Sequence, residues 1–347
     1  MIAVDWKSEP VQPQGGNDTG YLTANRCMRD AVQAAGVVID PMAQLSVSFE
    51  TPLTYRRARS GSKLEVLYTM WESPDFPLSV RPELDQADVV LVPSTFCRDL
   101  LAPYTKRRPL IVPLGFDPAT FSPPATDREW KRGESFQWLM VGAPNARKGW
   151  DVVEDIWDQT PYGHREDSHL YAKTVMTRSA ITAAVNDGWE MQESGVLTKR
   201  RIVLDPRRLP VALLAETYRR SHAFLFPTAG EGWGLTLLEA MATGLPCIAT
   251  RYSGLLDFTN PDTVRYVDWK PVVTGMGVDG DIVNSALADL NQVVEHMASI
   301  QHQYRAAVRM GKRAARDVRQ RFTWQHAGAA LARTLSDIAA RRSTFTL

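Results

Sequence analysis

The sequence predicts an α/β protein with two domains, each built around a parallel sheet, and the two sheets facing each other across a cleft. Short apolar runs alternate with helical patterns along most of the chain, which is typical of parallel sheets covered by helices. The 347 residues are too many for one ordinary core. A segment rich in proline and charge, 117–135, separates the two halves.

The apolar runs of the first half predict strands joined by short connections. Residues 21–35 have a helical pattern that ends at Gly36. The expected strands are 2–4, 37–39, 64–70, 89–92 and 110–112. We expect the first domain to span 1–126.

The second half repeats the alternation and closes on helices. The expected strands are 136–141, 202–205, 223–226 and 247–249. Residues 281–321 have a helical, charged pattern, and an amphipathic helix is expected at 325–340. We expect a second domain at 127–322 and a terminal segment, 323–347, that crosses back to the first.

Composition excludes several classes of protein. The apolar content is 44% and the formal net charge is +1, so no global field favours nucleic acid or a membrane surface. Cys27, Cys97 and Cys247 are far apart and form no CxxC pair, which favours reduced thiols in a cytoplasmic protein. The N-terminus lacks a signal-peptide pattern, and no apolar run is long enough to span a bilayer.

The most informative stretch is 227–250, where an apolar strand runs into a glycine-rich turn and then a helix. The start of a helix presents free backbone N–H groups and the positive end of its dipole, which suit a diphosphate. Glu231 lies on the turn, and Glu239 follows eight residues later, about two helical turns away.

The segment EGWGLTLLEAMATGLP, with Glu231 and Glu239 eight residues apart, resembles family 4 of the retaining glycosyltransferases. That resemblance implies the GT-B fold, two Rossmann-like domains with parallel sheets facing across a cleft. The alternative is the strand–turn–helix of any α/β protein with two surface acids.

The resemblance implies a site for a nucleotide-sugar, held mainly by the second domain. The diphosphate would lie at the start of the helix. The residues expected there are Gly232, Trp233, Gly234, Leu235 and Thr236. Glu239 would accept hydrogen bonds from the ribose hydroxyls. Glu231 would face the sugar ring.

A second segment with chemistry is GAPNARKG, 142–149, which places two cations at the end of a strand. Cations beside a diphosphate would neutralise a leaving nucleotide. Lys148 matches the lysine of the family, whereas Ala143 stands where the family has an arginine, and Arg147 is a candidate substitute. Two solvated charges at a helix start are the alternative, although the helix dipole disfavours them there.

In the first domain, the loop 15–20 and the segment LYTMWESP carry the resemblance. Gly20 would let the backbone approach the donor, because a Cβ would block it. Glu72, just after a strand, resembles the acid of the mWE segment in one branch of the family and is a candidate residue on the acceptor side, although a surface turn also fits.

Other family marks carry less chemistry. Leu204 is expected to contact the nucleobase through its backbone, and Arg207 and Arg208 fit either solvated charges or ligands of phosphate or ribose. Asp117 and Phe121 are expected to be structural.

The expected reaction is therefore glycosyl transfer with retention from a nucleotide-sugar such as a UDP- or GDP-hexose to an acceptor hydroxyl. Glu231, Lys148 and Glu72 are the candidate catalytic residues. We expect no metal ion and no cofactor. The acceptor, whether a glycan, a small molecule, a protein or a modified DNA base, stays open.

Three alternatives remain. Basic clusters at 56–59, 106–108 and 199–201 allow a GT-B enzyme that glucosylates a hydroxylated DNA base. The missing arginine at Ala143 allows a nucleotide-sugar binder without catalysis. The basic run 56–63 allows an enzyme at a membrane surface acting on a lipid acceptor, although this run lacks an apolar face.

Two motifs near residue 280 match known binding patterns but lack the sequence context that those patterns need. Residues 275–280 satisfy GxGxxG, but the helical pattern downstream lacks the strand of a dinucleotide-binding unit, so a flexible glycine loop is expected. Asp279 and Asp281 imitate a DxD metal motif, and Asp281 is expected to cap a helix instead.

Overall fold

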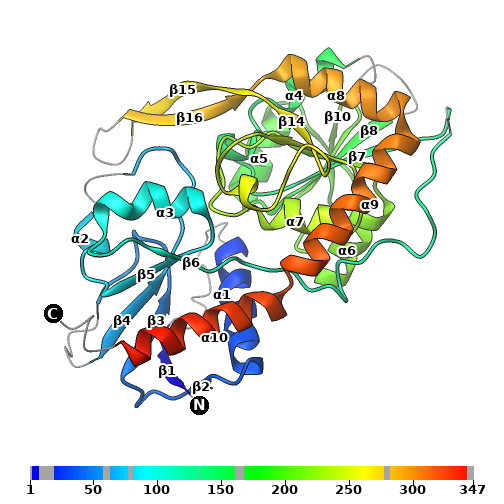
Figure 1. Cartoon of the computed structure of the whole chain (residues 1–347). Helices are drawn as coiled ribbons and strands as arrows, with labels where there is room; N and C mark the ends of the chain where they lie inside the picture. Colours follow the sequence, from blue (N-terminus) through cyan, green and yellow to red (C-terminus); the bar gives the residue numbers. More distant parts are fainter. Residues whose placement is uncertain are drawn as a thin grey trace.

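The computed structural model describes residues 2–7, 19–57, 63–76, 81–131, 133–160, 168–276 and 282–341. Two sheets form the framework, one in each half of the chain, with helices against them (Figure 1). The glycines of loop 15–20 before Thr19, and Asp279 and Asp281, lie outside the described residues.

The first sheet has six strands, all parallel, in the order β2-β1-β3-β4-β5-β6. Its strands are β1 (Ala3–Trp6), β2 (Val38–Ile39), β3 (Leu45–Phe49), β4 (Leu64–Tyr68), β5 (Val89–Val92) and β6 (Leu110–Ile111). The helices of this half are α1 (Thr19–Ala34), α2 (Arg81–Leu84), α3 (Thr95–Leu101) and a 3₁₀ turn, η2 (Ala102–Tyr104).

Strand β3 is absent from the sequence prediction. All five of its residues are buried, but Ser46 and Ser48 interrupt the apolar run by which a buried strand is recognised. It pairs with β1 and β4 and therefore lies inside the sheet.

The second sheet has eight strands in the order β14-β13-β12-β7-β8-β11-β10-β9. Its strands are β7 (Phe136–Val141), β8 (Ser168–Lys173), β9 (Glu190–Met191), β10 (Leu197–Lys199), β11 (Ile202–Asp205), β12 (Ala223–Phe226), β13 (Cys247–Thr250) and β14 (Arg265–Val267). Strand β10 runs antiparallel to both of its neighbours, β9 and β11, and the other pairs of this sheet are parallel. The carboxyl ends of its parallel strands meet at one edge, which is where α/β sheets bind ligands.

Helices and short turns of the second half surround this sheet. They are η3 (Ala146–Lys148), α4 (Val153–Gln159), α5 (Arg178–Asn186), α6 (Val211–Arg220), α7 (Leu235–Ala242), η4 (Ser253–Asp257), α8 (Leu290–His302) and α9 (Tyr304–Arg321).

The prediction of a helical pattern from 281 onwards is wrong for residues 282–288. Strand β16 (Ile282–Ala288) pairs with β15 (Trp269–Met276) in an antiparallel hairpin, and helix α8 begins only at Leu290 with Asp289 as its cap. Residues 282–288, IVNSALA, mix apolar, small and polar side chains without a clear alternation, so their strand pattern is weak. Figure 1 shows the hairpin reaching from the second half of the molecule above α2 and α3 of the first.

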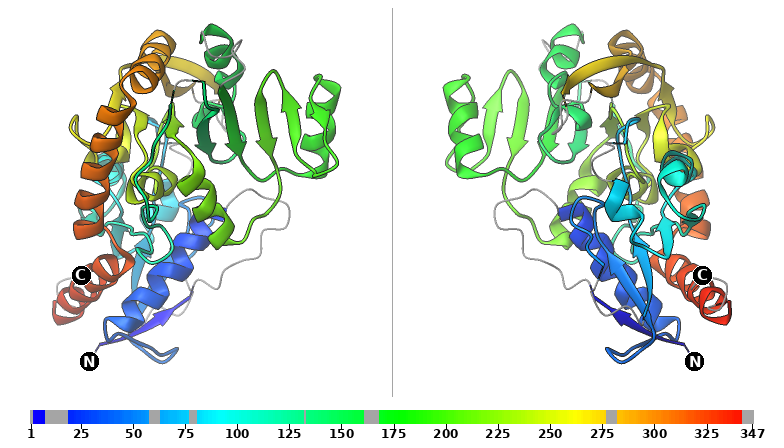
Figure 2. Two further views of the ribbon diagram at one scale, coloured as in Figure 1. Left: turned by 90° about the vertical axis from the view of Figure 1, so that its right-hand side faces the viewer. Right: turned by 90° about the vertical axis from the view of Figure 1, so that its left-hand side faces the viewer.

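The terminal helix α10 (Trp324–Ala340) lies against α1 of the first half, and the two remain together in both views of Figure 2. The chain therefore crosses between the halves twice, once after β6 and once before α10. The crossings meet where Phe116 N–H donates to the Phe322 carbonyl and Trp324 N–H donates to the Phe116 carbonyl, each at 3.0 Å.

The segment between the sheets is held in place by arginines. Arg128 is half-buried and donates to the backbone carbonyls of Tyr218, Arg219, Ser221 and Thr243. These carbonyls belong to the last turns or caps of α6 and α7, where a cation is favourable. Burial lowers the pKa of Arg128 to about 10.

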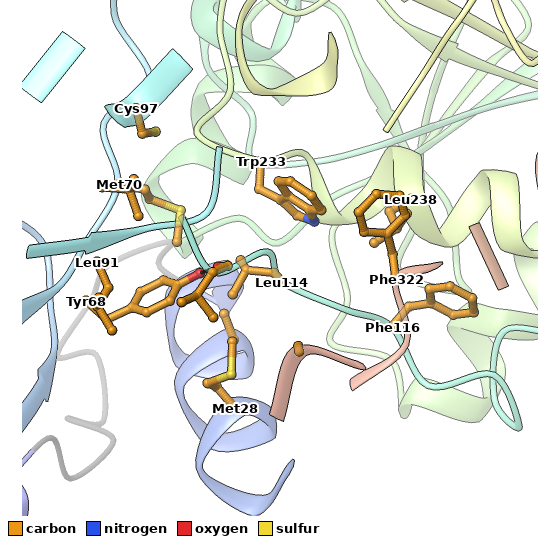
Figure 3. Close-up of a cluster of buried hydrophobic side chains, with 14 of the residues drawn as sticks. Met28, Tyr68, Met70, Leu91, Cys97, Leu114, Phe116, Trp233, Leu238 and Phe322 are labelled. Atoms are coloured by element: carbon orange, nitrogen blue, oxygen red, sulfur yellow. Dashed lines mark hydrogen bonds between the residues drawn. The ribbon is translucent and has the colours of Figure 1, made fainter. Parts of the chain in front are cut away.

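One hydrophobic core spans both halves. Figure 3 shows Trp233 of the second half between Met70 and Leu114 on one side and Phe322 on the other. The Trp233 ring is 1% exposed, and its centroid lies 5.0 Å from that of Phe258 and 5.5 Å from that of Phe322. The turn that carries Glu231 is therefore fixed against the first half by packing.

Candidate functional site

A cavity of about 640 Å³ lies between the two halves at the carboxyl end of the second sheet. Most of the residues expected at the site line it. They are Gly20, Glu72, Arg147, Lys148, Glu231, Gly232, Trp233, Gly234, Leu235, Thr236 and Glu239. Residues separated by more than two hundred positions thus meet in one place.

Lys148 and Glu231 form the closest pair in this cavity. Lys148 Nζ donates to Glu231 Oε1 at 2.5 Å, and Thr228 Oγ1 donates to the same oxygen at 2.9 Å. The Lys148 ammonium also lies 5.4 Å from the centroid of the Phe226 ring. Burial lowers the pKa of Lys148, although the Glu231 charge opposes that shift. Burial alone would raise the pKa of Glu231, but the charges of Lys148 and Arg147 outweigh it and hold this pKa below its ordinary value.

The turn η3 aims Lys148 inward. The Asn145 side chain accepts a hydrogen bond from Lys148 N–H at 3.1 Å and caps the turn. Gly149 then takes a left-handed φ of 78°, and a Cβ there would lie 2.6 Å from the Pro227 carbonyl oxygen. The loop after β7 is thus pressed against the loop after β12.

Arg147 lies beside this pair and contacts the same oxygen of Glu231 as Lys148 does. Its Nη1 donates to the Gly230 carbonyl at 2.8 Å and to Glu231 Oε1 at 3.1 Å. Its side chain is 31% exposed, against 13% for Lys148. Ala143, where the family carries an arginine, also lines the cavity.

Helix α7 begins at the cavity wall. Its N-cap, Gly234, is left-handed with φ 101°, so no side chain caps the first N–H groups. The hydroxyl of Thr236 and the indole N–H of Trp233 are buried there, and neither has a hydrogen-bond partner in the described structure. An uncapped helix start with an unsatisfied hydroxyl is suited to an anion.

Glu239 lies one helical turn further along α7. Its Oε2 accepts a hydrogen bond from the Tyr218 hydroxyl at 3.1 Å. Burial raises the pKa of this carboxyl to about 8, and the hydrogen bond from Tyr218 opposes that shift only in part. Glu239 is therefore mostly protonated at neutral pH, whereas Glu231 is ionised.

The glycines of the turn serve the contact between the halves. A Cβ at Gly230 would lie 2.1 Å from the main-chain oxygen of Glu72, and one at Gly232 would lie 2.8 Å from Met70 Cβ. The Ser94 hydroxyl also donates to the Gly232 carbonyl at 2.7 Å. Both glycines are thus needed for close approach of the first half. What Trp233 can offer a ligand is its main chain, because its ring is packed in the core.

The predicted contact between the Leu204 backbone and a nucleobase stays a prediction. The Leu204 side chain is buried in the core of the second half, and Leu204 is not among the residues that line the cavity. The cavity wall near the carboxyl ends of β8 and β11 is formed by Thr174 and Val175, which follow β8, together with Arg208 and Leu209. Strand β8 was not predicted because Ser168–Lys173 contains several polar residues and is no continuous apolar run. The residues at its carboxyl end were therefore not predicted as part of the site.

Four other residues singled out in the sequence lie in or near the cavity or in the segment between the two sheets. Arg207 forms an ion pair with Asp205, which favours a structural role over binding of a ligand. Arg208 lines the cavity. Asp117 accepts hydrogen bonds from Ala119 N–H and the Thr120 hydroxyl, which is a structural role. Phe121 packs edge-on against Tyr218 and also lines the cavity.

The cavity is positive in a chain that is nearly neutral. Five cations line it against three carboxyls, of which Glu239 is mostly neutral at pH 7. The cations are Arg26, Arg147, Lys148, Lys173 and Arg208. A cleft lined by one sign of charge concentrates ligands of the opposite sign.

Each basic cluster outside the cavity has at least one cation paired with a carboxylate. Arg57 makes two hydrogen bonds of 3.0 Å to Asp88, and Lys199 pairs with Glu154 at 2.9 Å. Arg108 pairs with Asp99, and Arg200 with Asp158. Such pairing weakens the argument for a DNA acceptor, since it leaves fewer of these cations for phosphates.

Two further properties concern the described part of the chain. No group of three or more His, Cys, Asp or Glu side chains there is arranged to hold a metal ion. None of its helices has the length and apolar character needed to cross a membrane.

Comparison with known proteins agrees with this architecture. Sucrose-phosphate synthase from Thermosynechococcus elongatus superposes with a TM-score of 0.75 at 16% identity, over 98% of this chain and 100% of that one. Alr3699/HepE from Anabaena, solved in complex with UDP and glucose, gives 0.64 at 12% identity, over 89% and 81%. The fold is therefore GT-B.

The sequence comparisons give the family. "Family 4 Glycosyltransferase in conflict systems" matches residues 95–331, more than half of the chain, and the protein belongs to that family. The chain is similar to the sulfoquinovosyl transferase SQD2 of Arabidopsis thaliana, 25% identical over 70% of this chain and 43% of that protein. It is also similar to a D-inositol 3-phosphate glycosyltransferase of Corynebacterium glutamicum, 32% identical over 44% and 31%. The matched regions span less than half of these relatives.

Proposed function

We propose that the protein transfers a hexose from a nucleotide-sugar, such as a UDP- or GDP-hexose, to an acceptor hydroxyl, with retention and without a metal ion. The observation that supports this most is the position of Lys148 and the start of α7 on one cavity, with Glu231 2.5 Å from the ammonium. A cation and free N–H groups together suit a departing diphosphate.

In this proposal the diphosphate lies between Lys148 and residues 234–236. Binding it would exchange part of the Lys148–Glu231 contact for a lysine–phosphate contact, and the carboxylate would face the sugar. Arg147, which already points to Glu231, would supply positive charge in place of the arginine missing at Ala143. Glu239 would accept hydrogen bonds from the ribose hydroxyls.

In the transfer step, the bond from the anomeric carbon to the diphosphate oxygen breaks and a bond to the acceptor oxygen forms on the same face. The acceptor proton moves to the departing phosphate oxygen. Catalysis is then mostly positioning and stabilisation of the leaving group. Glu231 would also stabilise positive charge at the anomeric carbon, and Glu72 would contact the acceptor.

The test is release of nucleoside diphosphate from UDP-glucose and GDP-mannose by the purified chain, with and without EDTA. We expect release that EDTA leaves unchanged, and a fall of about 100-fold or more in Lys148→Ala and Glu231→Ala. Lys106→Ala, which changes an ammonium 3.9 Å from Asp88 outside the cavity, is the control. Near wild-type turnover in both site variants would reject the proposal. NMR of the first-formed product anomer tests retention.

A further inference from the structure

A second cavity, of about 280 Å³, lies next to the first. Glu72 and Arg147 line both cavities and form their common wall. A molecule in the second cavity would therefore contact two residues that also line the donor cavity.

The β15–β16 hairpin builds one side of this second cavity. Val272 of β15 and residues 286–288 of β16 line it. The hairpin is fixed to the catalytic side of the sheet, because Ala286 N–H donates to the Ala229 carbonyl at 3.3 Å, two residues before Glu231. In Figure 1 the hairpin extends from the second half towards the first.

The wall of this cavity divides by chemistry. Its side towards the donor cavity carries Glu72, Ser73 and Arg147. The hairpin and the loops after β7 and β12 contribute mainly alanine, valine, leucine and proline, with Asp151 as a further polar residue. A wall of this kind favours an uncharged apolar body over a chain of sugar rings, whose hydroxyls would lose their partners in water.

The size limits the ligand. An apolar cavity of about 150 Å³ accommodates a benzene molecule, so this one has room for one ring and a short substituent.

We propose that this hairpin cavity binds the acceptor, and that the acceptor is a compact molecule with an uncharged ring-sized apolar body and a hydroxyl. The hydroxyl lies against Glu72 and Arg147, where its oxygen can attack the anomeric carbon while its proton passes to the departing phosphate. This inference rests on the proposed function of the donor cavity.

The experiment measures binding and needs no turnover. Benzyl alcohol is titrated into the full chain in the presence of UDP and followed by ligand-observed NMR, with glycerol as a hydroxylated probe without a ring. Val272→Trp fills the hairpin cavity without touching the donor cavity. Lys270→Trp is the matched control, since it adds the same ring to an exposed position two residues away on the same strand.

We expect saturable binding of benzyl alcohol to the wild type, at least 10-fold weaker binding to Val272→Trp, unchanged binding to Lys270→Trp and no binding of glycerol. Should Val272→Trp fail to fold, Val272→Phe gives the same comparison. Lack of benzyl alcohol binding to the wild type, or equal binding to Val272→Trp, overturns the inference. UDP affinity, measured in the same samples, reports on the donor cavity separately, so loss of one does not imply loss of the other.

Discussion

Glu239 makes donor binding depend on pH in a direction that the structure fixes. Burial raises its pKa to about 8, whereas hydrogen bonds from ribose hydroxyls favour the carboxylate. The apparent affinity for a nucleotide-sugar is therefore reduced by the fraction of protein in which Glu239 is still protonated. Affinity should rise with pH and level off above about pH 8.

The magnitude follows from the pKa. Between pH 6.5 and pH 8.5 the ionised fraction rises from about 3% to about 76%, so the dissociation constant should fall roughly 25-fold. Glu239→Gln keeps an acceptor oxygen but cannot ionise, and it should remove most of this dependence. Calorimetric titration with UDP-glucose measures the dissociation constant of both proteins at each pH. UDP-glucose suits this test because its diphosphate does not change its own charge between pH 6.5 and pH 8.5.

The stability of the protein without ligand should change in the opposite sense. A carboxyl whose folded pKa lies above its unfolded pKa stabilises the fold at low pH and loses this contribution as pH rises towards about 8. A donor affinity that does not change with pH, or that rises equally in the wild type and Glu239→Gln, would refute the assignment of Glu239 to the ribose.

Two further predictions concern the contacts that hold the site. Arg128→Met should lower the free energy of unfolding by about 2–4 kcal/mol, because four backbone carbonyls lose a charged donor. Arg220→Met, at an exposed side chain, should change the free energy of unfolding by less than about 0.5 kcal/mol in the same urea titration. Equal losses in the two variants would contradict this role. Gly230→Ala should lower the melting temperature more than Gly188→Ala, because both glycines have positive φ but only the first would place a Cβ 2.1 Å from the Glu72 carbonyl. Equal decreases in melting temperature in the two variants would mean that backbone strain at a positive φ, and not the contact with Glu72, explains the loss of stability.

Much of the fold could be predicted from the sequence because buried parallel strands are continuous apolar runs. Strands such as β7 and β12 lie where Phe136–Val141 and Ala223–Phe226 predicted them. Strand β3 was missed because Ser46 and Ser48 are buried inside it, and their hydroxyls hide the pattern. The β15–β16 hairpin was missed because its second strand is rich in small and polar residues and directly precedes a helix.

The sequence predicted those parts of the candidate site that depend on side chains near the turn of Glu231. It did not predict the contacts between the two halves, which depend on packing. Lys148 was expected near Glu231 from the resemblance, and the structure brings the two into direct contact. That Gly230 and Gly232 face the first half depends on long-range packing, which no local pattern encodes. The second cavity arises only when the hairpin folds over the loops of the sheet.

The measurement that tests the central claim most directly compares nucleoside diphosphates with their nucleosides. UDP and uridine, and GDP and guanosine, are titrated by calorimetry into the wild type and Lys148→Met. One diphosphate should bind far more tightly than its nucleoside, and Lys148→Met should weaken that diphosphate by about 10–100-fold while leaving the nucleoside unchanged. An unchanged ratio of the two affinities in Lys148→Met would contradict the assignment of this cavity to a diphosphate.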